Sequence, residues 1–371
     1  MESFGETVND PLRSWLSLPI KKGGTSIPDP EAVSKTNFYA SSHECSHLIE
    51  VLVKVSKFNV VTHGNHMSKI RNWMKMEKLK AANDWIDEHC NEANKETVRT
   101  IKYLKEDEVG TWLAAMPSFV CGTTLSPTEF RDEIHSRYGF GVLNTETHCG
   151  GCGAKFTSSH ALSCKVGGLI YMRHDESRDA IGILASQGFT PLNVHDEHII
   201  NPIRVKEEGG ILTGKKQKFV SECSDEDDVK SIDKGDRGDL LIRGFYEKGT
   251  NLIMDFRIYD LNQPSYQIRK PSAILKWAET AKKNYLNACL DQRRHVCPFV
   301  VSCEGMIGRE ANIFMKRLSM RLVKKWKQPY SQTVSFVRIR FPIALVRGKN
   351  RCIRGSRVLT KRISNKIDWE V

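Results

Sequence analysis

The chain has 371 residues, a formal net charge of +12 and 40% hydrophobic residues, which is too apolar for a wholly disordered protein. At roughly 150 residues per domain, this length predicts about two domains. No run of roughly 18 or more apolar residues occurs, so we expect no membrane span. The first residues have no apolar stretch after positive charge, so we expect no secretory signal. Eleven cysteines favour a reducing compartment, with some cysteines binding metal, over a disulfide framework.

Positive charge is concentrated toward the C-terminus. Residues 265–371 contain 24 Lys and Arg against 6 Asp and Glu, whereas the rest of the chain is net negative. Such an imbalance favours a polyanionic partner, with nucleic acid as the first candidate. A solvated helix face would show the same composition, so the charge alone does not choose between the two interpretations.

The first part of the chain is predicted to be helical. Apolar residues recur at three- and four-residue spacing in SHLIEVLVKV and TVRTIKYLKE. SPTEFRDEIHSRY is typical of a capped helix, which we expect to stop at Gly139. Trp73, Trp85 and Trp112 are expected to anchor the core of this region.

The following region predicts a mixture of helices and strands. RHDESRDAIGILASQG indicates a helix closed by Gly188, and PLNVHDEHIINP indicates a strand. The polar residues 204–238 are interpreted as an acidic mobile loop. DLLIRGFY and NLIMDFRIYD predict two strands joined by the turn EKGT.

The C-terminal region continues this alternation. SAILKWAETAKKNYLNACLDQRR predicts a long helix and CPFVVSCEG a short buried strand. MIGREANIFMKRLSMRLVKKW predicts a basic amphipathic helix. Its expected apolar side consists of Ile307, Ala311, Phe314, Leu318 and Leu322.

A cluster of metal-ligand residues lies in the segment CGGCGAKFTSSHALSC. A Cys-x-x-Cys pair, Cys149 and Cys152, can place two thiolates on one ion, and His160 and Cys164 can complete a tetrahedron. Three thiolates and one imidazole suit zinc, and four protein ligands leave no open position, so we expect a structural Zn²⁺. The alternatives are a coincidental Cys-rich loop and a site with His148 as a rival ligand, whose position next to Cys149 is unfavourable. The remaining cysteines are expected to be small core residues.

A second group of polar residues could bind Mg²⁺. Asp239 and Asp255 lie on the two strands of the predicted hairpin, which would bring both carboxylates to one end of the sheet. Glu176, on the helix before the first strand, could complete the group, and Lys282 and Lys283 follow on the next helix. In this interpretation the acids hold a cation against a phosphate, and a lysine orients water or neutralises the leaving group. Surface acids in a hairpin would give the same pattern.

Several segments carry a resemblance to a known family. HCGGCGAKFTSSHALSCKVGGLIYMRHDESRD, RGDLLIRGFYEKGTNLIMDFRIYD and AKKNY resemble the C-terminal region of non-LTR retrotransposon polyproteins, which carries a restriction-like endonuclease of the PD-(D/E)XK type. The resemblance implies a zinc knuckle and a nuclease that uses the acids and the lysine pair described above. Gly238 departs from the family, which has proline there, and Arg257 stands where many such nucleases have lysine. No reverse transcriptase motif is present.

The resemblance implies an α+β protein with a restriction-endonuclease-like α/β core and a mixed sheet. The expected domains are a helical region at 1–140, a CCHC knuckle at 141–170, the nuclease core at 171–330 and a basic helical C-terminal extension at 331–371. The expected function is a metal-dependent DNA endonuclease that acts in the nucleus on double-stranded DNA, without a membrane partner, and the element's RNA is a further candidate partner. A non-catalytic zinc-containing nucleic-acid-binding protein is the alternative, and a zinc-bearing protein-interaction scaffold is a third.

Overall fold

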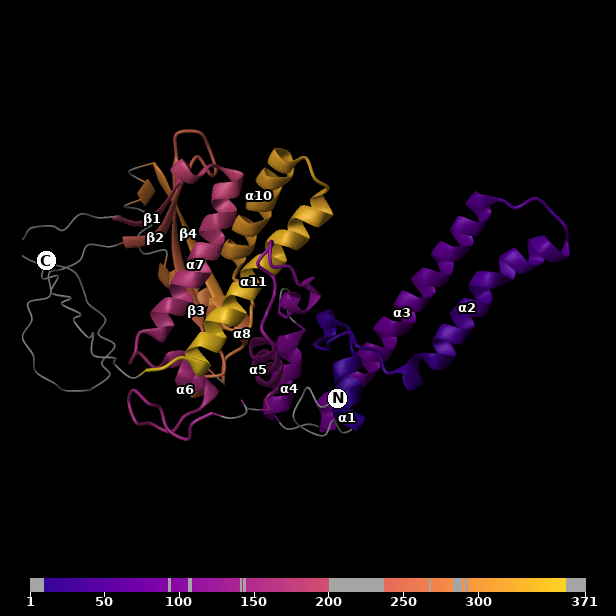
Figure 1. Ribbon diagram of the computed structural model, residues 1–371, viewed down its shortest axis with the longest axis horizontal. Coiled ribbons are helices and arrows are strands. Elements are labelled where there is room, and N and C mark those ends of the chain that lie inside the picture. The colour runs from indigo at the N-terminus through magenta and orange to yellow at the C-terminus, as the bar shows by residue number, and fades with distance from the viewer. Residues whose placement is uncertain are drawn as a thin grey trace, which may run out of the picture.

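The computed structural model describes residues 10–92, 95–105, 109–140, 142, 145–199, 237–266, 268–282, 289–290 and 293–357. This part of the chain is α+β, as predicted, with ten α-helices and a four-stranded mixed sheet (Figure 1). The helices before the sheet are α1 (Asp10–Ser17), α2 (Pro30–Val53), α3 (Val60–Glu92), α4 (Lys95–Leu104), α5 (Pro127–Tyr138), α6 (Ser158–Ser163) and α7 (Leu169–Gly188). The remaining elements are β1 (Val194–Ile199), β2 (Arg237–Arg243), β3 (Asn251–Tyr259), α8 (Pro271–Lys282), β4 (Arg294–Ser302), α10 (Arg309–Trp326) and α11 (Tyr330–Arg354).

The sheet has the strand order β1-β2-β3-β4. β1, β2 and β3 pair antiparallel in sequence order, and the register of the β2–β3 hairpin pairs Leu240 with Met254. β4 runs parallel to β3, so α8 serves as the crossover connection that a parallel pair requires. The order along the chain is therefore helix, strand, hairpin, helix, strand.

Three helices, α7, α10 and α11, cover one face of the sheet (Figure 1). The core beneath them contains four of the residues predicted for the apolar side of α10, together with alternate residues of the strands. The fifth, Ile307, precedes the helix and packs against this core from a bridge to Val301. Its fully buried members include Ile181, Leu240, Met254, Phe299, Phe314, Leu318 and Phe341. α8 packs against the other face, where Leu275 meets Val300.

The first helices share a core with the sheet. Trp15, Ile101 and Ile134 belong to the same buried cluster as Leu275 of α8 and Val300 of β4. Across this junction the ammonium of Lys349 on α11 lies 3.1 Å from the carboxylate of Glu133 on α5. Among the three tryptophans predicted to be core anchors, one is buried (Trp112), one is partly buried (Trp85) and one is 36% exposed (Trp73).

α5 has the predicted ends. The Ser126 side chain accepts a hydrogen bond from the backbone of Glu129, and the Glu129 side chain accepts one from the backbone of Ser126, which completes a capping box. Gly139 ends the helix in the left-handed region, at φ +76°, where glycine carries no steric penalty.

The segment expected to be a C-terminal extension packs within the core. α11 contributes Val337, Phe341 and Leu345 to the cluster beneath α7 and α10. Residues 358–371 lie outside the described residues, as do 204–236 of the predicted acidic loop, whereas Arg237 and Gly238 begin β2.

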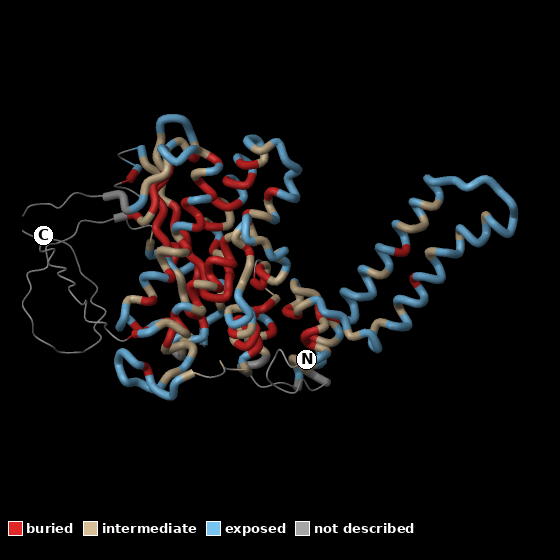
Figure 2. The backbone as a smooth tube through the Cα atoms, viewed as in Figure 1, coloured by how far each residue is buried: buried red, intermediate tan, exposed pale blue. Residues whose placement is uncertain are grey.

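α2 and α3 form a hairpin that projects away from the rest of the described chain (Figure 1). Most of its surface is exposed (Figure 2), and Ala40 is the one buried residue of α2. No helix in the part of the chain that the structure describes combines the length and apolar character needed to cross a bilayer.

Candidate functional site

The two predicted aspartates occupy neighbouring strands. Because Leu240 of β2 pairs with Met254 of β3, Asp239 and Asp255 are the adjacent positions on the two strands. Asp255 is buried and Asp239 is half-buried. Paired strands lie about 4.8 Å apart, so the hairpin brings the two carboxylates to one place, as the sequence predicted.

Each carboxylate has its own positively polarised partners. The ammonium of Lys282, at the end of α8, donates to both oxygens of Asp255 at 2.7 and 2.6 Å. The Oδ2 atom of Asp239 accepts a hydrogen bond of 2.6 Å from the backbone N–H of Phe256 and lies 3.4 Å from Nε2 of His174 on α7. Lys283, the alternative lysine, lies outside the described residues.

The two aspartates differ in their affinity for protons. Burial raises the pKa of Asp255, and the neighbouring Asp239 carboxyl raises it further, against the ion pair with Lys282. Burial also acts to raise the pKa of Asp239, but His174 and the Phe256 N–H outweigh it and hold that pKa below its ordinary value. The two carboxylates supply oxygen ligands of the kind that hard divalent cations prefer.

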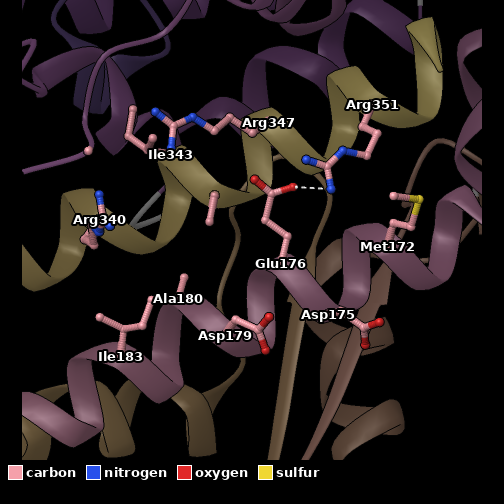
Figure 3. A pocket seen from close by; sticks show the side chains of 12 residues that line it. Met172, Asp175, Glu176, Asp179, Ala180, Ile183, Arg340, Ile343, Arg347 and Arg351 are labelled. Carbon is pink, nitrogen blue, oxygen red and sulfur yellow. Dashed lines mark ion pairs between the residues drawn. The ribbon is translucent and has the colours of Figure 1, made fainter. Parts of the chain in front are cut away.

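Glu176 lies elsewhere. Its carboxylate faces α11, where Oε2 is 3.3 Å from Nη1 of Arg351, in a pocket that Arg340 and Arg347 also line (Figure 3). This corrects the expectation that Glu176 completes the aspartate group. Two residues correspond to roughly 200° of rotation about a helix, so His174 reaches Asp239 while Glu176 points to α11.

The Cys/His group is brought together as predicted. One ligand atom from each of Cys149, Cys152, His160 and Cys164 lies within 4.8 Å of the others. The Sγ atoms of Cys149 and Cys164 are 3.9 Å apart, and Sγ of Cys152 is 3.3 Å from Nε2 of His160. This group could hold a metal ion such as zinc.

Local structure explains this convergence. The first two cysteines lie on a tight turn that Gly153 completes at φ +73°, and α6, capped by the Thr157 side chain, carries His160. Burial acts to raise the pKa of the Cys149 thiol, but backbone N–H groups of Cys152 and Gly151 and the His160 side chain lower it to about 6. A thiol with a lowered pKa is readily available as a thiolate, the form that binds metal.

The other cysteines meet the expectation only in part. Cys289, Cys297, Cys303 and Cys352 are buried, as core residues should be. Cys45 and Cys121 are exposed, and Cys90 is partly buried. Cys223 lies outside the described residues.

A basic groove, not anticipated as a site, lies between α10 and the turn of the β2–β3 hairpin. Two guanidinium groups of α10 lie over aromatic rings, Arg317 at 4.7 Å from the Tyr246 centroid and Arg321 at 5.1 Å from the Phe189 centroid. Arg243, Lys248 and Lys324 also line this groove. The basic composition of the predicted α10 helix was visible in the sequence, but its juxtaposition with the hairpin turn was not.

Comparison with protein-family models and with curated proteins finds no match to this sequence. Its function is therefore inferred from the geometry of these groups.

Proposed function

We propose that this protein is a metal-dependent DNA endonuclease of the restriction-like type, similar to the target-nicking module of non-LTR retrotransposons. The observation that carries the proposal is the convergence of Asp239, Asp255 and Lys282 from two strands and a helix. Two adjacent carboxylates with a lysine amine beside them form the group that phosphodiester hydrolysis by such a nuclease requires.

The order of elements supports the same proposal. A helix, a strand, the acid-bearing hairpin, a crossover helix and a final strand follow one another, as expected for the nuclease core from the resemblance. The Cys/His group directly precedes α7, which is where the resemblance implies a CCHC zinc knuckle. Its metal would be structural, since all four positions come from the protein.

The carboxylate pair fits Mg²⁺ by its donor chemistry, because Mg²⁺ is commonly held by one or two carboxylates together with substrate phosphates. Asp239 and Asp255 would hold the ion, which when bound lowers the pKa of a coordinated water and stabilises charge on the phosphorus. The Phe256 N–H fixes the orientation of the Asp239 carboxylate. The Lys282 ammonium is placed to neutralise the leaving oxygen or orient the attacking water, and Arg257 can bind a phosphate.

The basic groove supports nucleic acid as the substrate. Arg317, Arg321 and Lys324 place positive charge along one side of α10, and Tyr246 and Phe189 lie among these groups. Arg and Lys side chains on one surface bind phosphates without regard to sequence, and DNA binding through them weakens with salt.

A second candidate is a non-catalytic nucleic-acid-binding protein with the same zinc group. Lys282 already satisfies both oxygens of Asp255, and the third acid expected on α7 faces away. A self-satisfied ion pair is compatible with a purely structural role for the two residues.

Nicking of supercoiled plasmid in Mg²⁺ separates the two candidates. We expect the wild type and the control Asp179→Asn, a change to an exposed acid on α7 that pairs with Arg178, to nick DNA. Asp255→Ala should abolish nicking. Equal nicking by wild type and Asp255→Ala would exclude the endonuclease, and salt-sensitive DNA binding without nicks in Mg²⁺ or Mn²⁺ would establish the second candidate.

A further inference from the structure

Histidines from both helices of the projecting α2–α3 hairpin gather near its tip. The ring centroid of His47, on α2, lies 5.5 Å from that of His63 and 6.1 Å from that of His66, both on α3. The spacing of His63 and His66 puts two imidazoles on one face of α3, opposite His47. Nothing in the proposed nuclease uses these residues.

The ring spacing is close to that of imidazoles sharing one ion. With Zn–N distances of about 2.0 Å and tetrahedral angles, the centroids of two bound rings are about 5 Å apart. Among the described residues, the ligand atoms of the Cys/His group already lie within 4.8 Å of one another, whereas the three histidines do not meet this criterion. The side chains of the three histidines would have to turn before their nitrogens could share one ion.

The hydrogen bonds of the rings leave nitrogens available. A carbonyl oxygen can only accept, so the 2.6 Å contact between Nε2 of His66 and the His43 carbonyl means that Nε2 carries the proton. Nδ1 of His66 then keeps its lone pair. In metal-binding histidines, a hydrogen bond donated by one ring nitrogen leaves the other nitrogen as the ligand in the same way. Nδ1 of His47 and Nδ1 of His63 are buried and have no hydrogen-bond partner among the residues that the structure describes.

A partly exposed apolar side chain flanks the group. The Phe58 ring, in the loop between α2 and α3, lies 5.3 Å from the His63 ring and 6.1 Å from the His47 ring. An apolar neighbour limits water access to a metal and strengthens its bonds to imidazole.

Little apolar surface is buried near the tip of the hairpin. α2 buries a single alanine, while Leu52, Val53 and Val60 near the tip are exposed (Figure 2). Two helices with so little shared apolar surface gain little from burial. A metal bridging them would supply folding free energy directly, as structural zinc does in small domains.

From these observations we propose that His47, His63 and His66 form a second site for a divalent transition metal, which holds the tip of the α2–α3 hairpin together. Three imidazoles suit Zn²⁺, Ni²⁺ or Cu²⁺ and leave one position for water. Residues 43–47 spell H-E-x-x-H, but the His43 ring packs on Tyr39 at a centroid distance of 4.1 Å. His43 therefore contributes its carbonyl group, as the acceptor for His66, and the pattern does not form a protease-type site.

The number of zinc ions bound to the full chain tests this proposal. After metal removal and reloading with Zn²⁺, native mass spectrometry should show one ion fewer on the His47→Ala/His63→Ala variant than on the wild type. The control is His89→Ala, a change on the same helix where the ring stacks on Trp85, and it should keep the wild-type number. An equal number of ions on the wild type and the double variant would overturn the proposal.

Cobalt distinguishes this site from the Cys/His group even if the double variant folds poorly. In a Cys149→Ser/Cys164→Ser chain, Co²⁺ should still bind with ligand-field bands but without thiolate-to-cobalt charge transfer. Amide exchange over residues 47–66 should slow when the ion binds. Absence of Co²⁺ bands in that chain, or unchanged exchange, would contradict a histidine site at the hairpin tip.

Discussion

The carboxylate group and the Cys/His group differ in how much of their structure depends on an ion. The carboxylates are fixed by strand pairing in the core, and Lys282 and His174 already offset their charge. The Cys/His group lies on a turn and the six-residue helix α6, with Cys152 exposed. The first group is formed without a metal ion, whereas we predict that the second gains its rigidity when the four ligands hold one.

The largest effect is expected from Lys282→Met, which removes the resident cation of the carboxylate group. We expect DNA nicking to fall about a thousandfold, in line with the loss of a group that stabilises transition-state charge. Divalent cation binding should become tighter, because the ammonium no longer competes for the two oxygens of Asp255. Nicking rates and Mn²⁺ titration measure the two effects, and weaker Mn²⁺ binding would show that Lys282 supports the metal site instead of competing with the metal.

Removal of one thiolate tests how far the Cys/His group depends on a metal ion. Cys152→Ser should weaken zinc binding by about a hundredfold or more, because a tetrahedral site loses one of its four ligands. Zinc competition with a chromophoric chelator measures the change, and Cys121→Ser, at an exposed cysteine, serves as the control. Amide exchange should accelerate in α6 and remain unchanged in β2 and β3. A uniform acceleration would mean that the two regions are not independent.

His174 and Glu176 lie two residues apart on α7, and their substitutions should affect DNA nicking differently. His174→Ala removes the Nε2 contact with Asp239, so we expect nicking to fall about tenfold. Glu176→Gln alters only the pocket facing α11, so nicking should stay within about threefold of the wild type. Single-turnover nicking rates of the two variants measure these effects. A larger loss of rate for Glu176→Gln than for His174→Ala would show that Glu176 takes part in the reaction, as predicted from the sequence.

The smallest expected effect concerns the stability of the fold and comes from Glu304, which follows β4. Burial raises the pKa of Glu304, and the nearby carboxyls of Asp260 and Glu133 raise it further, against Lys349. Because the folded-state pKa is raised, the contribution of Glu304 to stability is complete below its unfolded pKa of about 4.3 and is lost as the pH rises through the folded value.

Glu304→Gln should therefore flatten the fall in unfolding free energy above about pH 4.3, by at most about 1.4 kcal/mol per pH unit, the limit for one proton. Urea unfolding across this pH range, with zinc present, measures the slope. An unchanged slope would assign the pH dependence to other groups.

The sequence predicted the parts of the two groups that depend on local spacing. Cys149 and Cys152 lie on one tight turn. The EKGT turn between two apolar segments predicted the hairpin that joins Asp239 and Asp255. The ends of α5 followed from its capping residues. In each case the interacting residues are close in the chain, so the backbone geometry of one turn determines their contact.

The contribution of α7 was not predictable in the same way. His174 and Glu176 are both polar residues on a helix that faces the sheet on one side and α11 on the other. Only the packing of α11 shows which of them points to Asp239. The C-terminal extension was expected to be helical, but the sequence did not show that α11 packs into the core beneath α7 and α10, with Lys349 on its buried side. Both failures concern contacts between elements distant in the chain.

Mn²⁺ binding measured by electron paramagnetic resonance tests most directly whether one divalent ion binds both strand aspartates. The zinc-loaded chain should bind one more Mn²⁺ ion than the Asp239→Asn/Asp255→Asn variant, with DNA increasing the affinity. Identical Mn²⁺ binding by the wild type and this variant would contradict a carboxylate metal site and, with it, the endonuclease.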